Sequence, residues 1–481
     1  MQYSTLSVLV SSIIQVVITL YLANSITLKE LGYISIVGIF FIIIENANDL
    51  GFSSGVIQKR KIYKREIMGL FYTSLTGCFI LTTSIWTVFY FYLFEILDRW
   101  VFISITILLF HLLIGQIGAI PISLFKKNLK FGILFWPELV FGIINIAVIY
   151  YLIEHGVGLA SNGVVAFCLA RGSGYLFRNI IALWLSIKFG YFSIVRRALF
   201  WKKNILWYYK FGFFSFCANL LSLLTRFSDQ FIISYFIGLE FLGLYKVILD
   251  LMLLPVSRLN SIFNNVYFPI LSKLNKDRLL YRSKFIELIN LTAFITLPIV
   301  YGIFSISHLF SSTFLDNRWG DINGLMLAIM IAAIFRTLLN PLGVFLLSQG
   351  KAHITMYWGI MIFSLQTIFM SIGGWLMGTN GLLFAFALVQ VLFFLISYGF
   401  IIKKNIDMKP MNYYSLTLRS NLIALFMGSI VYIISKELYN YINPWLVMTV
   451  SVTIGMIIYM ACSKYLNIKT YHQAISLITK T

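Results

Sequence analysis

Ten ionisable side chains lie inside long apolar stretches of this sequence, where charged residues are otherwise rare. They are Glu45, Asp49, Glu138, Arg171, Arg178, Arg226, Asp229, Lys246, Asp250 and Arg336, and Arg258 lies closer to the end of its stretch. A charge that faces hydrocarbon costs about 3 kcal/mol or more, so we expect these groups to face the protein interior or a watery cavity. They are the candidates for chemistry.

The arginines predict a site for an anion. Arg171 and Arg178 are seven residues apart, which places both on one face of a helix. Because no acid is close in sequence to either of them or to Arg336, we expect a surplus of positive charge there. Guanidinium groups hold phosphate bidentately. We therefore expect an anionic ligand such as a phosphate, and the candidate basic residues are Arg171, Arg178, Arg226, Arg258, Arg336 and Lys246.

The acids leave two interpretations open. Glu45 and Asp49 are one helical turn apart, and they either neutralise the arginines or the bases at 59–61, or they take up protons. Asp229 follows Arg226 by three residues and Asp250 follows Lys246 by four, so intrahelical pairing competes with a functional role. The candidate acids for ion coupling or for a cavity wall are Glu45, Asp49, Asp229 and Asp250.

The sequence predicts neither a metal site nor a catalytic centre. The five histidines, at positions 111, 155, 308, 353 and 472, never fall three or four residues apart. The four cysteines are scattered singly and form no CxxC pair. We therefore expect no cofactor, and chemistry limited to binding and to the exchange of protons or sodium ions.

The composition requires a membrane to surround these charges. The chain of 481 residues is 60% hydrophobic and 11% charged, with a mean hydropathy of +0.88, whereas soluble domains are about one quarter charged. We expect an all-α, multi-span protein, because single apolar segments in lipid satisfy their own backbone only as helices. Fourteen spans are predicted, at 4–24, 31–57, 67–94, 101–124, 132–153, 160–187, 209–236, 241–268, 285–310, 324–348, 354–377, 380–402, 418–436 and 443–463.

The basic residues predict how these spans are oriented. If the N-terminus is cytoplasmic, the inside connections carry 27 Lys and Arg residues and the outside connections carry four. This bias matches the positive-inside rule and places both termini in the cytoplasm. It also accounts for most of the +20 net charge by contact with anionic lipid headgroups, so no nucleic-acid partner is expected. The first apolar segment lacks a basic leader and a cleavage site, and is expected to be a retained span.

An internal repeat predicts two lobes. KELGYISI at 29–36 resembles EFLGLYKV at 240–247, which aligns Gly32 with Gly243, and SNGVVAFCLA at 161–170 resembles TNGLLFAFAL at 379–388. Helices 1–6 are thus expected to repeat as helices 7–12 in parallel orientation around a central cavity. The predicted division is an N-lobe at 1–187, a basic linker at 188–208 that is either an interfacial helix or a plain loop, a C-lobe at 209–402, and two further helices with a tail at 403–481.

Two segments resemble a known family. LKELGYISIVGIFFIIIENANDLGFSSGVIQKR at 28–60 is similar to the second helix of Wzx-type polysaccharide flippases, which belong to the multidrug/oligosaccharidyl-lipid/polysaccharide exporter superfamily. RFSDQFIISYFIGLEFLGLYKVILDLMLLPVSRLNSIFNNVYFPILSKLNKD at 226–277 resembles helices 7 and 8 of the branch that includes colanic-acid and teichuronic-acid exporters. The resemblance covers about residues 1–400.

The resemblance implies a function. It implies twelve helices in two lobes plus two C-terminal helices, and transfer of an undecaprenyl-pyrophosphate-linked sugar repeat unit across the bacterial cytoplasmic membrane, driven by an ion gradient. A polysaccharide polymerase and a chain-length regulator become candidate partners. This chain lacks the basic residue that relatives carry in helix 1, which leaves the anion contact to helices 6, 7, 8 and 10.

Two other functions remain open at this stage. A multidrug exporter of the same fold calls for an acidic cavity, whereas the candidates here are rich in arginine. A glycan polymerase needs a large external loop with catalytic groups, and the longest outside connection, near 311–323, is short.

Overall fold

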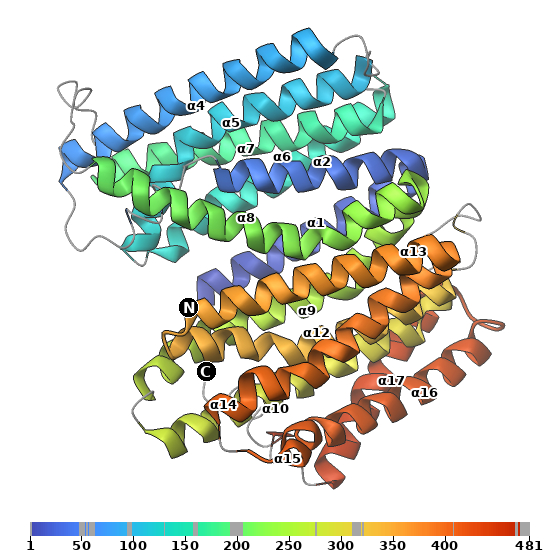
Figure 1. The fold of residues 1–481 in the computed structure, drawn as a ribbon. Helices are drawn as coiled ribbons and strands as arrows, with labels where there is room; N and C mark the ends of the chain where they lie inside the picture. The colour runs from blue at the N-terminus through green and yellow to red at the C-terminus, as the bar shows by residue number, and fades with distance from the viewer. Residues whose placement is uncertain are drawn as a thin grey trace. The chain divides into compact units, whose positions relative to one another are not determined.

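The structure is a computed structural model, and the part of the chain that it describes is entirely helical and turn (Figure 1). The described residues are 2–47, 53, 56, 63–93, 99–128, 130–156, 162–192, 205–274, 277–309, 319, 322–406, 408–466 and 470–471. The protein is a multi-span membrane protein. Eight helical segments of the described chain are long and apolar enough to cross a bilayer by length and composition alone.

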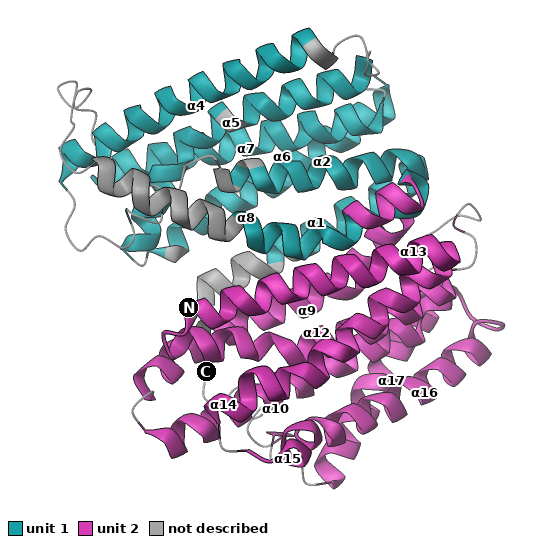
Figure 2. Cartoon of the chain, viewed as in Figure 1, with its two compact units in different colours: residues 1–230, 239–243 teal, residues 231–238, 244–481 magenta. Residues whose placement is uncertain are grey.

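The chain forms two compact units (Figure 2). Unit 1 comprises residues 1–230 and 239–243. Its helices are α1 (Gln2–Ser25), α2 (Leu28–Ala47), α4 (Lys64–Leu93), α5 (Arg99–Lys127), α6 (Phe131–His155), α7 (Gly163–Lys188) and most of α8 (Ile205–Phe236). Within this unit α7 packs along both α5 and α6, and α6 also packs on α1.

Unit 2 comprises residues 231–238 and 244–481. It holds most of α9 (Leu239–Leu274), then α10 (Arg278–Ser305), α12 (Asn323–Ser348), α13 (Ala352–Ser397), the π-helical turn η4 (Tyr398–Ile402), α14 (Lys403–Asn405), α15 (Pro410–Ser415), α16 (Leu418–Leu438) and α17 (Pro444–Tyr465). Phe285 and Phe345, both fully buried, join α10 to α12 in its core, with ring centroids 4.4 Å apart. The C-terminal pair packs through α16 on α10.

The predicted spans correspond to the observed helices. Each of the fourteen matches one helix or one arm of α13, whose helical geometry breaks at Gly378 (φ 56°, ψ −134°), between the spans predicted at 354–377 and 380–402. The predicted start at residue 285 is wrong: α10 begins at Arg278, because the Asp277 carboxylate caps it by accepting from the N–H groups of Leu279 and Leu280. Short helices α14 and α15, in a segment predicted as a connection, were missed.

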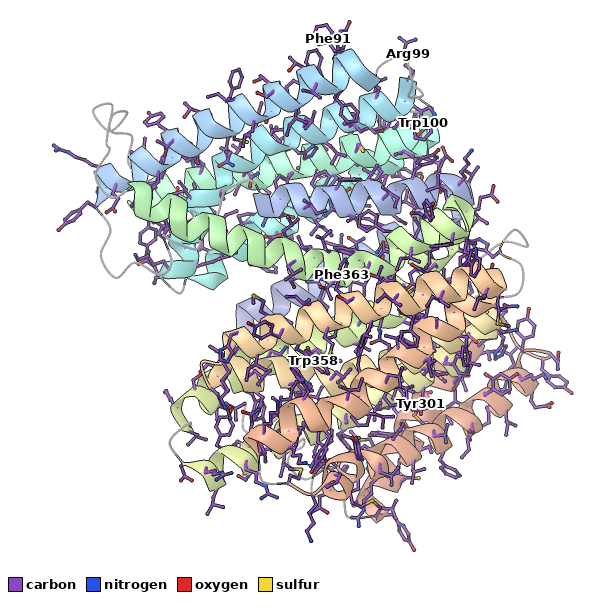
Figure 3. All side chains as sticks on the ribbon, viewed as in Figure 1. Phe91, Arg99, Trp100, Tyr301, Trp358 and Phe363 are labelled. Carbon is purple, nitrogen blue, oxygen red and sulfur yellow. The ribbon has the colours of Figure 1, made fainter. Side chains whose placement is uncertain are left out.

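Large apolar side chains cover the outside of the helices (Figure 3). Phe91, near the end of α4, is 80% exposed, and Trp375 on α13 is 78% exposed. A water-soluble protein rarely exposes so many large apolar side chains next to one another. Lipid is the solvent that these side chains fit, as the hydropathy of the sequence predicts.

The two aligned glycines of the repeat meet in space. The start of α2 and the start of α9 cross so closely that a Cβ atom on Gly32 would overlap the carbonyl of Leu239, and one on Gly243 would overlap the carbonyl of Leu28. The offset of 211 residues that relates Gly32 to Gly243 also relates Leu28 to Leu239. The contact is therefore reciprocal between the two copies of the repeat, and only a residue without a side chain fits at either point.

This crossing generates a prediction. Gly32→Val is expected to destabilise the protein by about 1–3 kcal/mol, since the added side chain must push two backbones apart. Gly38→Val is the matched control, because it lies on the same helix and a Cβ there meets no atom within 4 Å. Thermal unfolding of both purified variants in detergent measures the difference. Equal unfolding temperatures for the two variants would contradict the close crossing.

Candidate anion-binding site

Helix α7 carries the two arginines that the sequence places on one face. It starts where Asn162 caps it, with the side-chain oxygen accepting from the N–H of Val164 at 3.0 Å. Its small residues allow close packing: Gly172 faces the ring of His111 on α5, where a Cβ would not fit. A Cβ at Gly174 would likewise press on the carbonyl oxygen of Phe141 on α6, so the register of α7 is fixed against both neighbours between Arg171 and Arg178.

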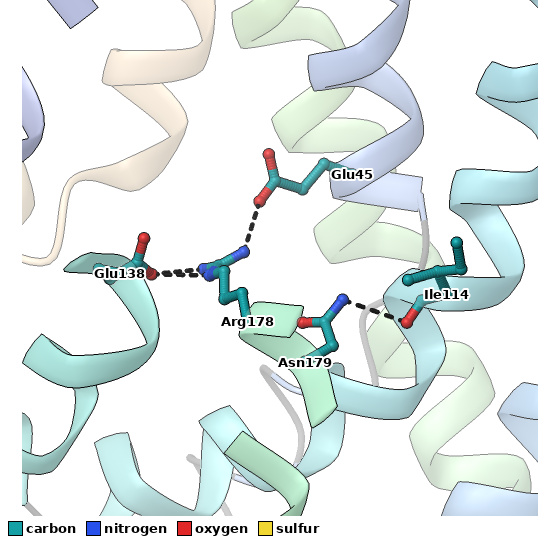
Figure 4. Close-up of polar contacts among 5 residues, drawn as sticks. All are labelled: Glu45, Ile114, Glu138, Arg178 and Asn179. Carbon is teal, nitrogen blue, oxygen red and sulfur yellow. Dashed lines mark hydrogen bonds and ion pairs between the residues drawn. The ribbon is translucent and has the colours of Figure 1, made fainter. Parts of the chain in front are cut away.

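Arg178 lies between two carboxylates from two other helices (Figure 4). Its Nε atom donates to Oε1 of Glu138 on α6 at 2.9 Å, and its Nη2 atom forms an ion pair with the same oxygen at 2.6 Å. Its Nη1 atom donates to Oε1 of Glu45 on α2 at 3.4 Å. The Arg178 side chain is 14% exposed, whereas Glu138 and Glu45 are 33% and 36% exposed.

This geometry corrects one expectation from the sequence. A surplus of positive charge is expected at Arg178 because no acid is near it in sequence, but two carboxylates from helices distant in sequence, Glu45 and Glu138, neutralise it. Of the two interpretations left open for Glu45, pairing with an arginine is what the structure shows. The charges of Arg171 and Arg178 are matched in number by those of Glu45 and Glu138, so this part of unit 1 holds no large positive surplus.

Arg171 is held differently. Its guanidinium carbon lies 4.7 Å from the ring centroid of Phe41 on α2 and 5.9 Å from that of Phe167 on its own helix. Its Nε atom is buried and has no hydrogen-bond partner in the structure. Cation–π contact supports the charge without consuming its hydrogen bonds, so Arg171 retains donor capacity next to the Arg178 cluster.

Asn179, next to Arg178, fixes this part of α7 against α5 (Figure 4). Its amide nitrogen donates to the carbonyl of Ile114 at 3.1 Å, and Gly118 leaves room for the amide group. The side chain is almost fully buried. A satisfied buried amide of this kind rigidifies the helix pair and thereby restrains where the adjacent guanidinium can point.

In unit 2 the predicted residues form separate contacts. The intrahelical pair on α9 is confirmed, with Lys246 Nζ and Asp250 Oδ1 2.5 Å apart. Arg336 on α12 places its guanidinium carbon 5.0 Å from the ring centroid of Phe386 on α13. Arg258 is partly buried on α9, in the same unit. Within this unit, therefore, a carboxylate neutralises Lys246, whereas an aromatic face supports Arg336.

The remaining predicted residues lie at the end of α8 or outside the described chain. Arg226 is exposed, with its guanidinium carbon 5.5 Å from the ring centroid of Phe227. Asp229 is fully buried and accepts from the N–H of Gln230 at 3.0 Å. Asp49, and residues 193–204 of the predicted linker, lie outside the described residues. The anion-binding and ion-coupling roles of all these residues stay predictions.

Among the described residues, a cavity of about 400 Å³ lies in unit 2 between α10, α16 and α17. Its lining is apolar and includes Phe294, Pro298, Met427, Met456 and Tyr459, with no charged residue. It offers nothing to an anion, and it shares no residue with the sites described above.

The comparison with protein families shows to which family the chain belongs. The profile described as "Polysaccharide biosynthesis protein" matches residues 8–323, about two thirds of the chain. The chain belongs to this family. Among individual relatives, this member is 25% identical to the teichuronic acid biosynthesis protein TuaB of Bacillus subtilis, over 98% of this chain and 95% of that protein. It is 24% identical to the lipopolysaccharide biosynthesis protein WzxC of Escherichia coli, over 48% and 47% of the two chains.

Solved structures show the same fold. The lipid II flippase MurJ in an inward closed conformation superimposes with a TM-score of 0.75 at 15% identity, covering 99% of this chain and 100% of that one. An inward-facing multidrug resistance MATE transporter superimposes with a TM-score of 0.63 at 15% identity, covering 85% and 96%. The family member thus has the all-helical architecture of flippases and exporters, as the sequence resemblance implied.

Sequence reasoning missed the role of Glu138. It was recognised as a charge within an apolar stretch, but it received no function because no base is near it in sequence. Phe41 was also missed, since one phenylalanine among 44 carries no signal. Both residues become relevant only when α2 and α6 are placed against α7.

The asymmetry of the Arg178 contacts predicts unequal stabilities. Glu138→Gln is expected to lower the free energy of unfolding by about 1–3 kcal/mol, because a mostly buried guanidinium loses its main counter-charge. Glu45→Gln is expected to cost less, since it removes a single 3.4 Å contact. Thermal unfolding in detergent ranks the two variants. The assignment fails if Glu45→Gln is the more destabilising one.

Proposed function

We propose that this family member transfers a polyprenyl-diphosphate-linked oligosaccharide from the cytoplasmic to the outer face of the bacterial cytoplasmic membrane, for the synthesis of a surface polysaccharide. The arginines attract the diphosphate, the sugars occupy a polar cavity, and the polyprenyl tail stays in lipid. Binding shifts the population from inward-facing to outward-facing states. The protein itself makes or breaks no covalent bond.

One observation carries the proposal: two arginine side chains lie among the membrane-spanning helices of unit 1, and at least one of them keeps a hydrogen-bond donor that a ligand could use. Arg178 is aligned by Glu138, and Arg171, seven residues away on the same helix, keeps a buried Nε atom without a partner. Arginine is the side chain best matched to phosphate oxygens. The relatives named for teichuronic acid and lipopolysaccharide biosynthesis, and the lipid II flippase fold, support the same substrate class.

Energy and orientation complete the proposal. Transport is coupled to a gradient of protons or sodium ions, with Glu45, Asp49, Asp229 and Asp250 as the candidate exchanging acids. Both termini lie in the cytoplasm, as the distribution of basic residues indicates. A polysaccharide polymerase and a chain-length regulator are the proposed partners at the outer face.

The fold also fits a multidrug exporter, since MATE transporters superimpose on this chain. The buried Nε donor of Arg171, which has no hydrogen-bond partner among the described residues, favours an anionic substrate over the cationic drugs that an acidic cavity would take. A dye-efflux assay beside an assay of lipid-linked sugars in the same strain separates the two functions.

Deletion of the gene tests the direction of transport. Undecaprenyl-linked repeat units are expected to accumulate on the cytoplasmic face, where an added membrane-impermeant glycosidase does not reach them in intact spheroplasts. Accumulation on the outer face would indicate a polymerase instead. Unchanged levels of surface polymer in the deletion strain would contradict a role in export.

Substitution of the arginines tests the anion contact. Arg171→Ala and Arg336→Ala are each expected to reduce surface polysaccharide at least tenfold at normal protein levels in the membrane. Arg99→Ala at the start of α5 is the control, because Arg99 lies outside the candidate set (Figure 3). Wild-type polymer in both test variants would remove these two residues from the site.

A further inference from the structure

We infer that Glu45 occupies the place of the substrate's diphosphate on Arg178, and that Glu138 is the fixed residue that positions this guanidinium. In the absence of substrate, Glu45 neutralises the free edge of Arg178. On binding, a phosphate oxygen replaces the Glu45 carboxylate, while Glu138 stays in place. This inference rests on the proposed function, because it assumes a diphosphate ligand.

The two acids hold Arg178 unequally, as this exchange requires. Oε1 of Glu138 accepts a hydrogen bond from Nε at 2.9 Å and forms a 2.6 Å ion pair with Nη2. Glu45 receives one, from Nη1, at 3.4 Å, which is longer than the usual charge-assisted N–H···O distance of about 2.7–2.9 Å. One side of the guanidinium is thus tightly held, and the other is held by a weak contact.

The helices that carry the two acids also differ in how firmly they pack on α7. Glu138 belongs to α6, which packs along much of α7, whereas Glu45 belongs to α2, which contacts α7 over a far smaller area. A shift of Glu45 therefore requires little repacking, while a shift of Glu138 would disturb one of the two large helix interfaces of α7.

Charge and exposure allow the exchange. The Glu45 side chain is 36% exposed and can regain water on leaving Arg178, whose own side chain is only 14% exposed. Replacing one anion by another keeps the guanidinium paired, so no unpaired charge is left in the membrane interior.

A consequence is that the carboxylate of Glu45 competes with the substrate. Removing its charge is expected to tighten binding of a diphosphate, whereas removing the charge of Glu138 is expected to weaken it, because Arg178 loses its orientation. A partly exposed ion pair contributes up to about 1 kcal/mol, which corresponds to about a fivefold change in affinity.

The experiment measures equilibrium binding of undecaprenyl diphosphate to the purified full chain in mixed micelles, with undecaprenol as the uncharged comparison. Glu45→Gln is expected to lower Kd about fivefold, and Glu138→Gln to raise it by at least as much. Glu138→Asp, which keeps the charge, is expected to restore part of the affinity. Glu154→Gln is the matched control, since Glu154 is exposed and lies about 24 Å further along α6.

The outcomes separate the inference from the proposed function. If the wild-type protein binds undecaprenyl diphosphate no better than undecaprenol, the proposed function fails. If it prefers the diphosphate but Glu45→Gln leaves Kd unchanged or raises it, the exchange is refuted. If Glu138→Gln tightens binding as Glu45→Gln does, the assignment of the fixed and the displaced acid is overturned.

A second variant tests the exchange even if Glu45→Gln does not fold. Glu45→Asp keeps the charge but withdraws the carboxylate by one methylene from a contact that is already 3.4 Å long. The exchange predicts tighter diphosphate binding for this variant than for the wild type. A Kd above that of the wild type would contradict the exchange.

Discussion

A guanidinium inside a bilayer needs a counter-charge at every stage of its working cycle, and this constraint organises unit 1. Arg178 lies on α7, which packs along both α5 and α6, and two carboxylates from different helices share its charge. Desolvation makes each unpaired charge expensive. If Arg178 binds a lipid-linked anion as we propose, the two carboxylates neutralise it until the ligand arrives.

The same constraint explains why the charges are distributed as they are. Arg171 and Arg336 rest on aromatic rings, and Lys246 is neutralised by Asp250 one turn away. A ring face stabilises a cation without competing for its hydrogen bonds, whereas a carboxylate competes directly. Among the described residues of unit 1, Arg171 over Phe41 keeps a buried Nε atom without a hydrogen-bond partner, and the orientation of Arg178 is defined by its contacts with Glu138.

The helices could be predicted from the sequence because their cause is local. The lengths of the apolar segments and the polar connections between them predict fourteen spans. The break of α13 at Gly378 falls between two of these spans. The alignment of Gly32 with Gly243 identified residues that later proved to lie at one crossing. The first turns of α10 were missed because Asp277 and Arg278 are typical of a polar connection. Only the structure shows that the Asp277 side chain caps the helix.

The ion pairs could not be predicted because their cause is not local. Glu138 is 40 residues from Arg178 and Glu45 is 133 residues away, so no spacing rule relates them. Pairs one turn apart, such as Lys246 with Asp250, are within reach of such rules. The general lesson is that sequence finds the charges that a membrane protein must explain, whereas only the packing of helices shows which of them neutralise one another.

The central claim is that this chain moves a diphosphate-linked glycan lipid between leaflets. The most direct measurement reconstitutes the purified protein in liposomes that contain a radiolabelled undecaprenyl-diphosphate oligosaccharide, and follows its exposure to an external glycosidase over time. The account predicts transfer that is much faster than in protein-free liposomes and that slows sharply in Arg178→Gln. Transfer at the protein-free rate under an imposed proton or sodium gradient would contradict it.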